Sequence, residues 1–211
     1  NGTTLGADNG IGVASIMTLL ASTDIPHPAL EALFTIDEET GMTGALGLQG
    51  GLLEADILLN LDTEDDDELT IGCAGGIDVT IGGNYKTEKV NPDSMGFRIT
   101  VKGLTGGHSG MDIYKGRGNA NKLIARILLS AADKFEPRIK TIDGGGLRNA
   151  IPREAFAEVA IHTGESEDFT ALISQEAELI KKEYQSTDPN LSISIETIVT
   201  PETVLETAFQ Y

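Results

Sequence analysis

The stretch Phe34–Gly41 (FTIDEETG) decides how the first part of the chain is interpreted. The apolar run from Leu30 to Ile36 predicts a buried strand of a parallel sheet, and it ends in three consecutive carboxylates. Ligands of such sheets bind at the carboxyl ends of the strands, and adjacent acids need a cation or a shared proton to relieve their repulsion. A second run, Ala55–Leu61, leads into Asp62. Two strands that deliver acids to one edge predict a metal site.

Helical patterns alternate with these two runs. Apolar residues between 11 and 20 follow Asp8-Asn9-Gly10, which predicts a helix with an Asp or Asn cap. A short helix near residues 42–49 is expected to end at Gly50 and Gly51. The order helix, strand, helix, strand predicts that residues 1–74 form part of a layered α/β catalytic domain.

The pattern changes after a glycine-containing boundary near residues 72–76, so a second domain of the lid or dimerisation type, itself expected to be incomplete, is predicted over 75–211. Residues 77–81 and 97–101 alternate apolar and polar side chains, as half-buried antiparallel strands do. Helices are expected at 119–135 and 168–184, and further strands at 138–142, 155–161 and 191–195. From residue 97 the order is β-α-β-β-α-β, which predicts an α+β ferredoxin-like lid domain.

The composition of the chain excludes several classes of function. A formal charge of −18 over 211 residues argues against binding to nucleic acid and to anionic membranes, because both require clustered Lys and Arg. No apolar run approaches the roughly 18 residues that a membrane span needs. The single cysteine, Cys73, excludes an internal disulfide and fits a reducing, cytoplasmic setting. Because the sequence begins at Asn1 in an expected loop, we expect it to be an internal piece of a longer protein.

The acids of the first domain have both structural and functional interpretations. Asp8 is placed as a helix N-cap or as a metal ligand, and position alone favours the cap. Glu38 and Glu39 are either solvated acids or a pair in which one binds metal and the other handles a proton. Asp8, Glu39 and Asp62 come from three consecutive crossovers of one parallel sheet and can therefore converge. Carboxylates alone favour magnesium or manganese, so zinc would need histidines from outside this sequence.

Two glycine-rich loops of the second domain carry polar side chains. His108 follows Gly106 and Gly107, which makes the imidazole accessible; the alternative is a flexible linker with an incidental histidine. A Ser-His-Asp triad is disfavoured because Ser109 is adjacent to His108. The turn at residues 144–152 carries Arg148 and Asn149, and it is either a simple hairpin or a clamp for a substrate carboxylate or carbonyl.

Five segments in this order resemble the M20 family of metallopeptidases, and in particular its dipeptidases. Each segment is weak evidence by itself, but five in the family's order make a strong signal. They are Thr4–Gly12 (TLGADNGIG), Phe34–Gly41 (FTIDEETG), Asn60–Glu64 (NLDTE), Gly106–Gly110 (GGHSG) and Arg148–Pro152 (RNAIP).

The resemblance implies a site with two zinc ions per full-length subunit, or alternatively manganese or cobalt. Asp8 would bridge the ions, Glu39 would bind one and Asp62 the other, and Glu38 would be the general base. The peptide bond from Asp8 to the next residue would be cis. His108 would stabilise the oxyanion, in relatives often across a dimer, and Asn149 would contact substrate.

The resemblance also implies a cytoplasmic homodimer that hydrolyses unblocked dipeptides, including the Xaa-His type. The family's histidine ligands would lie outside this sequence, so we expect the chain alone to bind zinc poorly and to be inactive. The alternatives are an aminoacylase or tripeptidase with the same machinery, or a non-catalytic dimerisation or binding module. The strand-end acids speak against the last alternative, because a scaffold has no use for them.

Overall fold

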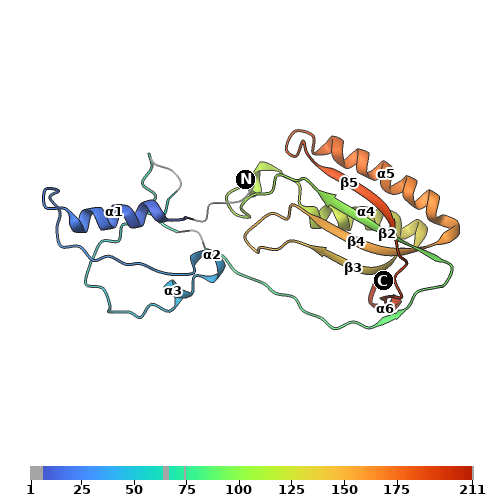
Figure 1. Cartoon of the computed structure of the whole chain (residues 1–211), viewed down its shortest axis with the longest axis horizontal. Helices are drawn as coiled ribbons and strands as arrows, with labels where there is room; N and C mark the ends of the chain where they lie inside the picture. The colour runs from blue at the N-terminus through green and yellow to red at the C-terminus, as the bar shows by residue number, and fades with distance from the viewer. Residues whose placement is uncertain (1–6, 64–66, 74, 211) are drawn as a thin grey trace. The chain divides into compact units, whose positions relative to one another are not determined.

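The computed structural model describes residues 7–63, 67–73 and 75–210 (Figure 1). It divides into two compact units, Asn1–Asp78 and Val79–Tyr211. The start of the first family-like segment, residues 4–6, and Glu64 of the third lie outside the described residues.

The second unit is built on a four-stranded antiparallel sheet. Its strands are β2 (Ser94–Lys102), β3 (Arg138–Gly144), β4 (Ala155–His162) and β5 (Ser192–Ile198). They lie in the order β3-β4-β2-β5, with α4 (Ala120–Phe135) between β2 and β3 and α5 (Ser166–Glu183) between β4 and β5. The expected ferredoxin-like order is therefore confirmed.

Both helices pack into one core with the inward side chains of the sheet (Figure 1). Alternation along β2 and β4 places every second residue in this core, as a half-buried strand requires. Phe169 of α5 is fully buried between the rings of Phe97 and Phe135, whose centroids lie 5.5 and 5.7 Å away. These three rings join one strand to two helices.

The two long helices have clear end signals. Asn119 caps α4 by accepting a hydrogen bond from the Lys122 N–H at 3.2 Å, and Glu136 ends the helix in the left-handed conformation. In α5, acids occupy the first turn and Lys181 and Lys182 the last, which complements the helix dipole.

A small ribbon pairs the two ends of this unit. Strand β1 (Thr87–Lys89) is antiparallel to β6 (Thr203–Leu205), and the short helix α6 (Thr207–Gln210) follows. Arg138 of β3 donates to Glu88 at 2.5 Å and to the Leu205 carbonyl at 2.7 Å, so β3 is fastened to this ribbon. Short helical turns, η1 (Ile113–Lys115) and η2 (Thr163–Glu165), complete the unit.

The first unit contains α1 (Gly10–Ala21), α2 (Glu38–Gly41) and α3 (Thr43–Leu46). The helix expected at 42–49 is α3, which ends at Leu46 and not at Gly50 and Gly51 as expected; Met42, with a positive φ of 55°, separates it from α2. The strands expected at 30–36 and 56–61 were wrong for this structure, because neither segment is assigned to a strand.

A strand exists only where a neighbour completes its hydrogen bonds, and apolar runs are buried only where other elements cover them. The two segments are fastened near their beginnings, where the Glu54 and Ala55 N–H groups donate to Glu31 at 2.9 and 2.7 Å. Beyond that point no ladder forms among the described residues, and Ile57 remains 79% exposed. These runs thus have strand propensity without the partners that a sheet supplies.

The strand expected at 77–81 is also absent, and Ile77, Val79 and Ile81 are exposed. This segment contains the division between the two units, where alternation had suggested a half-buried surface. Among the described residues, no helix combines the length and apolar character needed to cross a membrane.

Candidate functional site

His108 lies in a loop, residues 103–118, that connects β2 to α4. A bridge of antiparallel type joins it to Ala150, so the loop is paired with the connection between β3 and β4. The Ser109 N–H donates to the Asn149 carbonyl and the Ile151 N–H donates to the Gly107 carbonyl, both at 2.8 Å. The two glycine-rich loops expected to carry site residues therefore form one surface.

The His108 ring is oriented by its own loop. Its Nδ1 lies 3.1 Å from the Gly110 nitrogen and 3.2 Å from the Met111 nitrogen, and both N–H groups donate to it. When Nδ1 accepts hydrogen bonds in the neutral imidazole, the hydrogen is on Nε2. Nε2 has no hydrogen-bond partner among the described residues, so it is available as a donor to a ligand.

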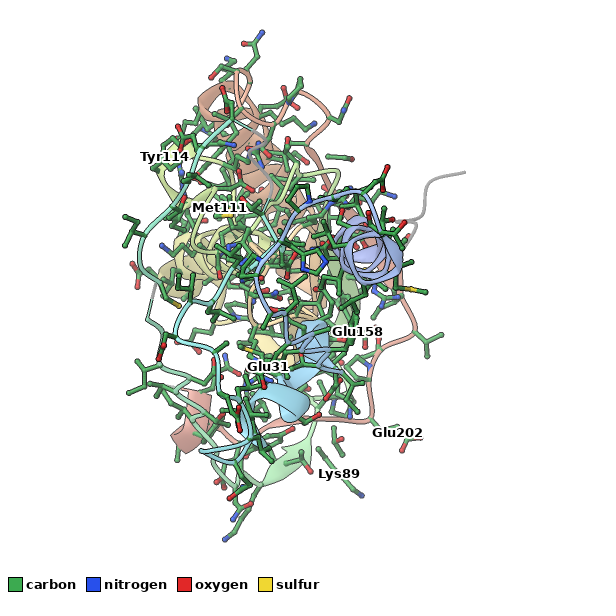
Figure 2. The ribbon with its side chains drawn as sticks, turned by 90° about the vertical axis from the view of Figure 1, so that its left-hand side faces the viewer. Glu31, Lys89, Met111, Tyr114, Glu158 and Glu202 are labelled. Atoms are coloured by element: carbon green, nitrogen blue, oxygen red, sulfur yellow. The ribbon has the colours of Figure 1, made fainter. Side chains whose placement is uncertain are left out.

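Asp112 holds the backbone of the same loop. One of its oxygens accepts from the His108 N–H at 2.8 Å and lies 3.5 Å from Arg117, while the other accepts from Lys115 at 2.6 Å. The Lys115 hydrogen bond, followed by that of the His108 N–H, lowers the pKa of the Asp112 carboxyl. Met111 and Tyr114 belong to this loop and are exposed to solvent (Figure 2).

Gly107 is required by this arrangement. Its φ is +141°, and a Cβ there would lie 2.5 Å from both the Arg117 guanidinium and the Asp112 carboxylate. The residue before His108 is therefore glycine because two charged side chains close over its α-carbon.

A hollow of about 420 Å³ lies beside this loop. Residues of the β3–β4 connection, including Arg148, form one side of it, and Ser109 and Asn119 contribute from the His108 loop and its end. Gly144 ends β3 and Ala155 begins β4, so residues 145–154 connect two antiparallel strands. Arg148 and Asn149 are exposed on that hairpin.

The strand-end acids adopt a helical turn instead of following a strand. Asp37 immediately precedes α2, has a positive φ of 61° and accepts hydrogen bonds from the Thr40 and Thr43 hydroxyls. The Thr40 hydroxyl, and then that of Thr43, lowers the pKa of the Asp37 carboxyl. Glu38 and Glu39 follow in the first turn of α2 and are exposed.

Asp8 is not the cap of α1. Asn9 has that role, because its side-chain oxygen accepts from the Gly12 N–H at 2.9 Å. The capping interpretation of Asp8 was therefore wrong, and its carboxylate is exposed. The peptide bond between Asp8 and Asn9 is cis, as the family resemblance implied.

The expected metal ligands do not form a cluster. Asp62 is exposed, and its N–H donates to the Asn60 side chain at 3.1 Å. In the part of the chain that the structure describes, no three His, Cys, Asp or Glu side chains lie close enough to hold a metal ion. Asp8, Glu39 and Asp62 remain predicted ligands by chemistry, since carboxylate oxygens bind divalent cations.

Sequence reasoning missed two acids of the second unit. Neither Asp112 nor Asp188 was singled out as a candidate. The Thr105 and Gly118 N–H groups that donate to Asp188 lie 83 and 70 positions away, so no local pattern could have identified this role.

The second unit is similar to a peptidase dimerisation domain of the M20 type. Residues 95–188 match the family described by that name, and this match lies entirely within the ferredoxin-like unit. The resemblance expected from the five segments is confirmed by this match and by two relatives.

The cytosol non-specific dipeptidase of Escherichia coli (strain K12) is 45% identical over 204 residues, which is 97% of this chain and 42% of that protein. The crystal structure of aminoacylhistidine dipeptidase from Vibrio alginolyticus is 44% identical, with a TM-score of 0.72 over 100% of this chain and 43% of that chain. The chain thus spans less than half the length of either relative.

Proposed function

We propose that the full-length protein carrying this sequence is a metal-dependent dipeptidase that hydrolyses unblocked dipeptides. The observation that carries the proposal is the His108 imidazole, which is held at Nδ1 in a loop whose next residue, Ser109, lines a hollow together with Arg148. The 45% identity to a dipeptidase supports the same reaction class.

Each side chain has one role in this proposal. Nε2 of His108 donates to the oxygen of the scissile carbonyl, where negative charge develops as water adds. Glu38 takes a proton from the attacking water and returns it to the leaving amine. Arg148 and Asn149 fix the substrate from the β3–β4 hairpin, and Arg148 suits a carboxylate.

Asp8, Glu39 and Asp62 are the residues proposed to hold the metal ions. Three exposed carboxylates fit divalent cations by donor type, and zinc would take its nitrogen ligands from residues outside this sequence. When bound, such ions polarise a carbonyl and lower the pKa of water to about 7. We further propose a homodimer formed through the dimerisation domain, and a cytoplasmic location like that of the Escherichia coli relative.

The test uses the full-length protein, stripped of metal and reloaded with zinc. Hydrolysis of an unblocked Xaa-His dipeptide is compared with hydrolysis of an N-acetylated amino acid. Zinc-dependent cleavage of the dipeptide alone supports the proposal. Cleavage of the acetylated compound alone assigns the machinery to an aminoacylase, and cleavage of neither leaves a binding or dimerisation module.

His108→Ala tests the oxyanion role, and we expect kcat to fall about a hundred- to a thousand-fold. His162→Ala is a matched control, because His162 is also exposed and its Nδ1 also accepts a backbone N–H, that of Gly164 at 3.2 Å. Equal rates for the two variants would remove His108 from the mechanism.

A further inference from the structure

Asp188 is a buried carboxylate that the proposed chemistry does not use. It lies in the turn between α5 and β5 and is 1% exposed. Burying a charged group is costly unless hydrogen bonds replace its water, so each of its partners is informative. Burial works to raise the pKa of the Asp188 carboxyl, but hydrogen bonds from Thr105, Gly118 and Thr187 outweigh it and lower the pKa.

The two oxygens of Asp188 bind the two ends of the His108 loop. Oδ1 accepts from the Thr105 N–H at 2.8 Å, and Oδ2 accepts from the Gly118 N–H, also at 2.8 Å. Oδ2 further accepts from the Thr187 hydroxyl at 2.9 Å. One side chain therefore closes the segment from 105 to 118, which includes His108.

Two further hydrogen bonds hold the ends of this segment in place. The Thr105 hydroxyl donates to the Thr187 carbonyl at 2.9 Å, and Arg117 donates to the Gly106 carbonyl at 2.6 Å. These bonds bring residues 105–106 next to residues 117–118. His108 lies two positions beyond this closure, with Asp112 holding its N–H.

We propose that Asp188 is a positioning residue for His108: by closing both ends of the loop, it fixes the imidazole with Nδ1 as acceptor and Nε2 left as a donor. The catalytic part of this inference rests on the proposed function. Preorganised donors cost no rearrangement during reaction, and a displacement of about 1 Å can lower a rate about a hundred-fold.

Asp188→Asn is the informative substitution. The amide keeps the size of the side chain but has only one acceptor oxygen, so its NH₂ group would face one of the two loop N–H groups. One end of the loop is then released. Thr187→Val is a milder second variant, because it removes one hydroxyl donor and leaves both backbone bonds of Asp188 in place.

The first readout is spectroscopic and needs no substrate. The ring nitrogens of His108 are observed by NMR in the ¹⁵N-histidine-labelled full-length protein and assigned by comparison with His108→Ala. The wild type is expected to show Nδ1 as acceptor and Nε2 protonated, and Asp188→Asn is expected to shift both signals toward a tautomer mixture. Ile173→Val is the control, because it removes a methyl group from the core of α5 and no bond to the loop.

The second readout is a double-mutant cycle in the same protein. Asp188→Asn alone is expected to lower kcat about ten- to a hundred-fold with little change in KM, whereas in the His108→Ala background it should have almost no further effect. The kcat of Thr187→Val should lie between the values for wild type and Asp188→Asn.

The outcomes separate this inference from the proposed function. Unchanged His108 ring signals in Asp188→Asn would overturn the positioning role. So would a fall in kcat that is equal in the wild-type and His108→Ala backgrounds. In both cases, turnover of the dipeptide by the wild type would still support the proposed dipeptidase function. If the wild type cleaves no dipeptide, the proposed function fails, and the ring signals alone decide whether Asp188 orders the loop.

Discussion

Replacement of Phe169 by Leu tests whether the three-ring contact holds the second unit together. Phe169 is 0% exposed, and its ring contacts Phe97 and Phe135 at centroid distances of 5.5 and 5.7 Å. An aromatic pair contributes about 0.5–1.5 kcal/mol beyond its buried area, so losing two pairs costs about 1–3 kcal/mol. Phe169→Ala also leaves a cavity and is expected to cost about 3–5 kcal/mol.

The assay is urea unfolding followed through the methyl NMR signals of Ile99 and Ile124. Both residues are buried in the same core, so the transition observed belongs to this unit. The free energy of unfolding should fall in the order wild type, Phe169→Leu, Phe169→Ala, with the slope against urea unchanged.

Leu129→Ala is the control, because Leu129 on α4 is 71% exposed and its truncation should change stability by less than about 0.5 kcal/mol. If Phe169→Leu unfolds at the same urea concentration as this control, the rings do not carry the stability assigned to them.

Three shorter predictions concern charge and backbone. The pKa of the Asp188 carboxyl is lowered in the folded protein, so this carboxylate stabilises the fold fully at pH values above the ordinary pKa of an Asp carboxyl. The stabilisation is lost as the pH falls through the lowered pKa. The urea midpoints of wild type and Asp188→Asn should therefore converge in acid. Gly103→Ala should lower the midpoint, since φ is +78° and its Cβ would lie 2.2 Å from a backbone carbonyl, whereas Gly146→Ala, in open space, should not. Arg126→Ala removes an exposed pair with Glu183, so midpoints measured in high salt should match wild type.

The second unit was predictable because its signals are local and the elements that form its core lie within the same unit. Apolar spacing placed a helix at 119–135, and the structure forms it over Ala120–Phe135 with Asn119 as its cap. Alternation at 97–101 and 155–161 gave two strands that are neighbours in the sheet. Each prediction required only a periodic pattern of apolar residues in the sequence. The strands and helices that pack against the predicted elements belong to the same unit.

The strands of the first unit and part of the candidate site could not be predicted, because they depend on contacts between residues that are distant in the sequence. The run at 56–61 has the residues of a buried strand, but a strand also needs a hydrogen-bonded neighbour and a covered face. Of the predicted site, His108 and the 148–149 hairpin are brought together by backbone hydrogen bonds between two loops. Asp188 was missed because its contacts join distant positions, and Asp8 was weighed as a cap although Asn9 has that role.

The position of β2 in the sheet has a consequence for synthesis on the ribosome. It is flanked by β4 and β5, and the Gly96 N–H near its start donates to the hydroxyl of Thr200, 104 positions later. At about 5–20 residues per second, translation needs roughly 5–20 seconds to cover that distance. During that time one edge of β2 lacks its neighbour β5, and its backbone hydrogen-bonding groups are unpaired. This is the interval in which a chaperone would be most needed to prevent aggregation.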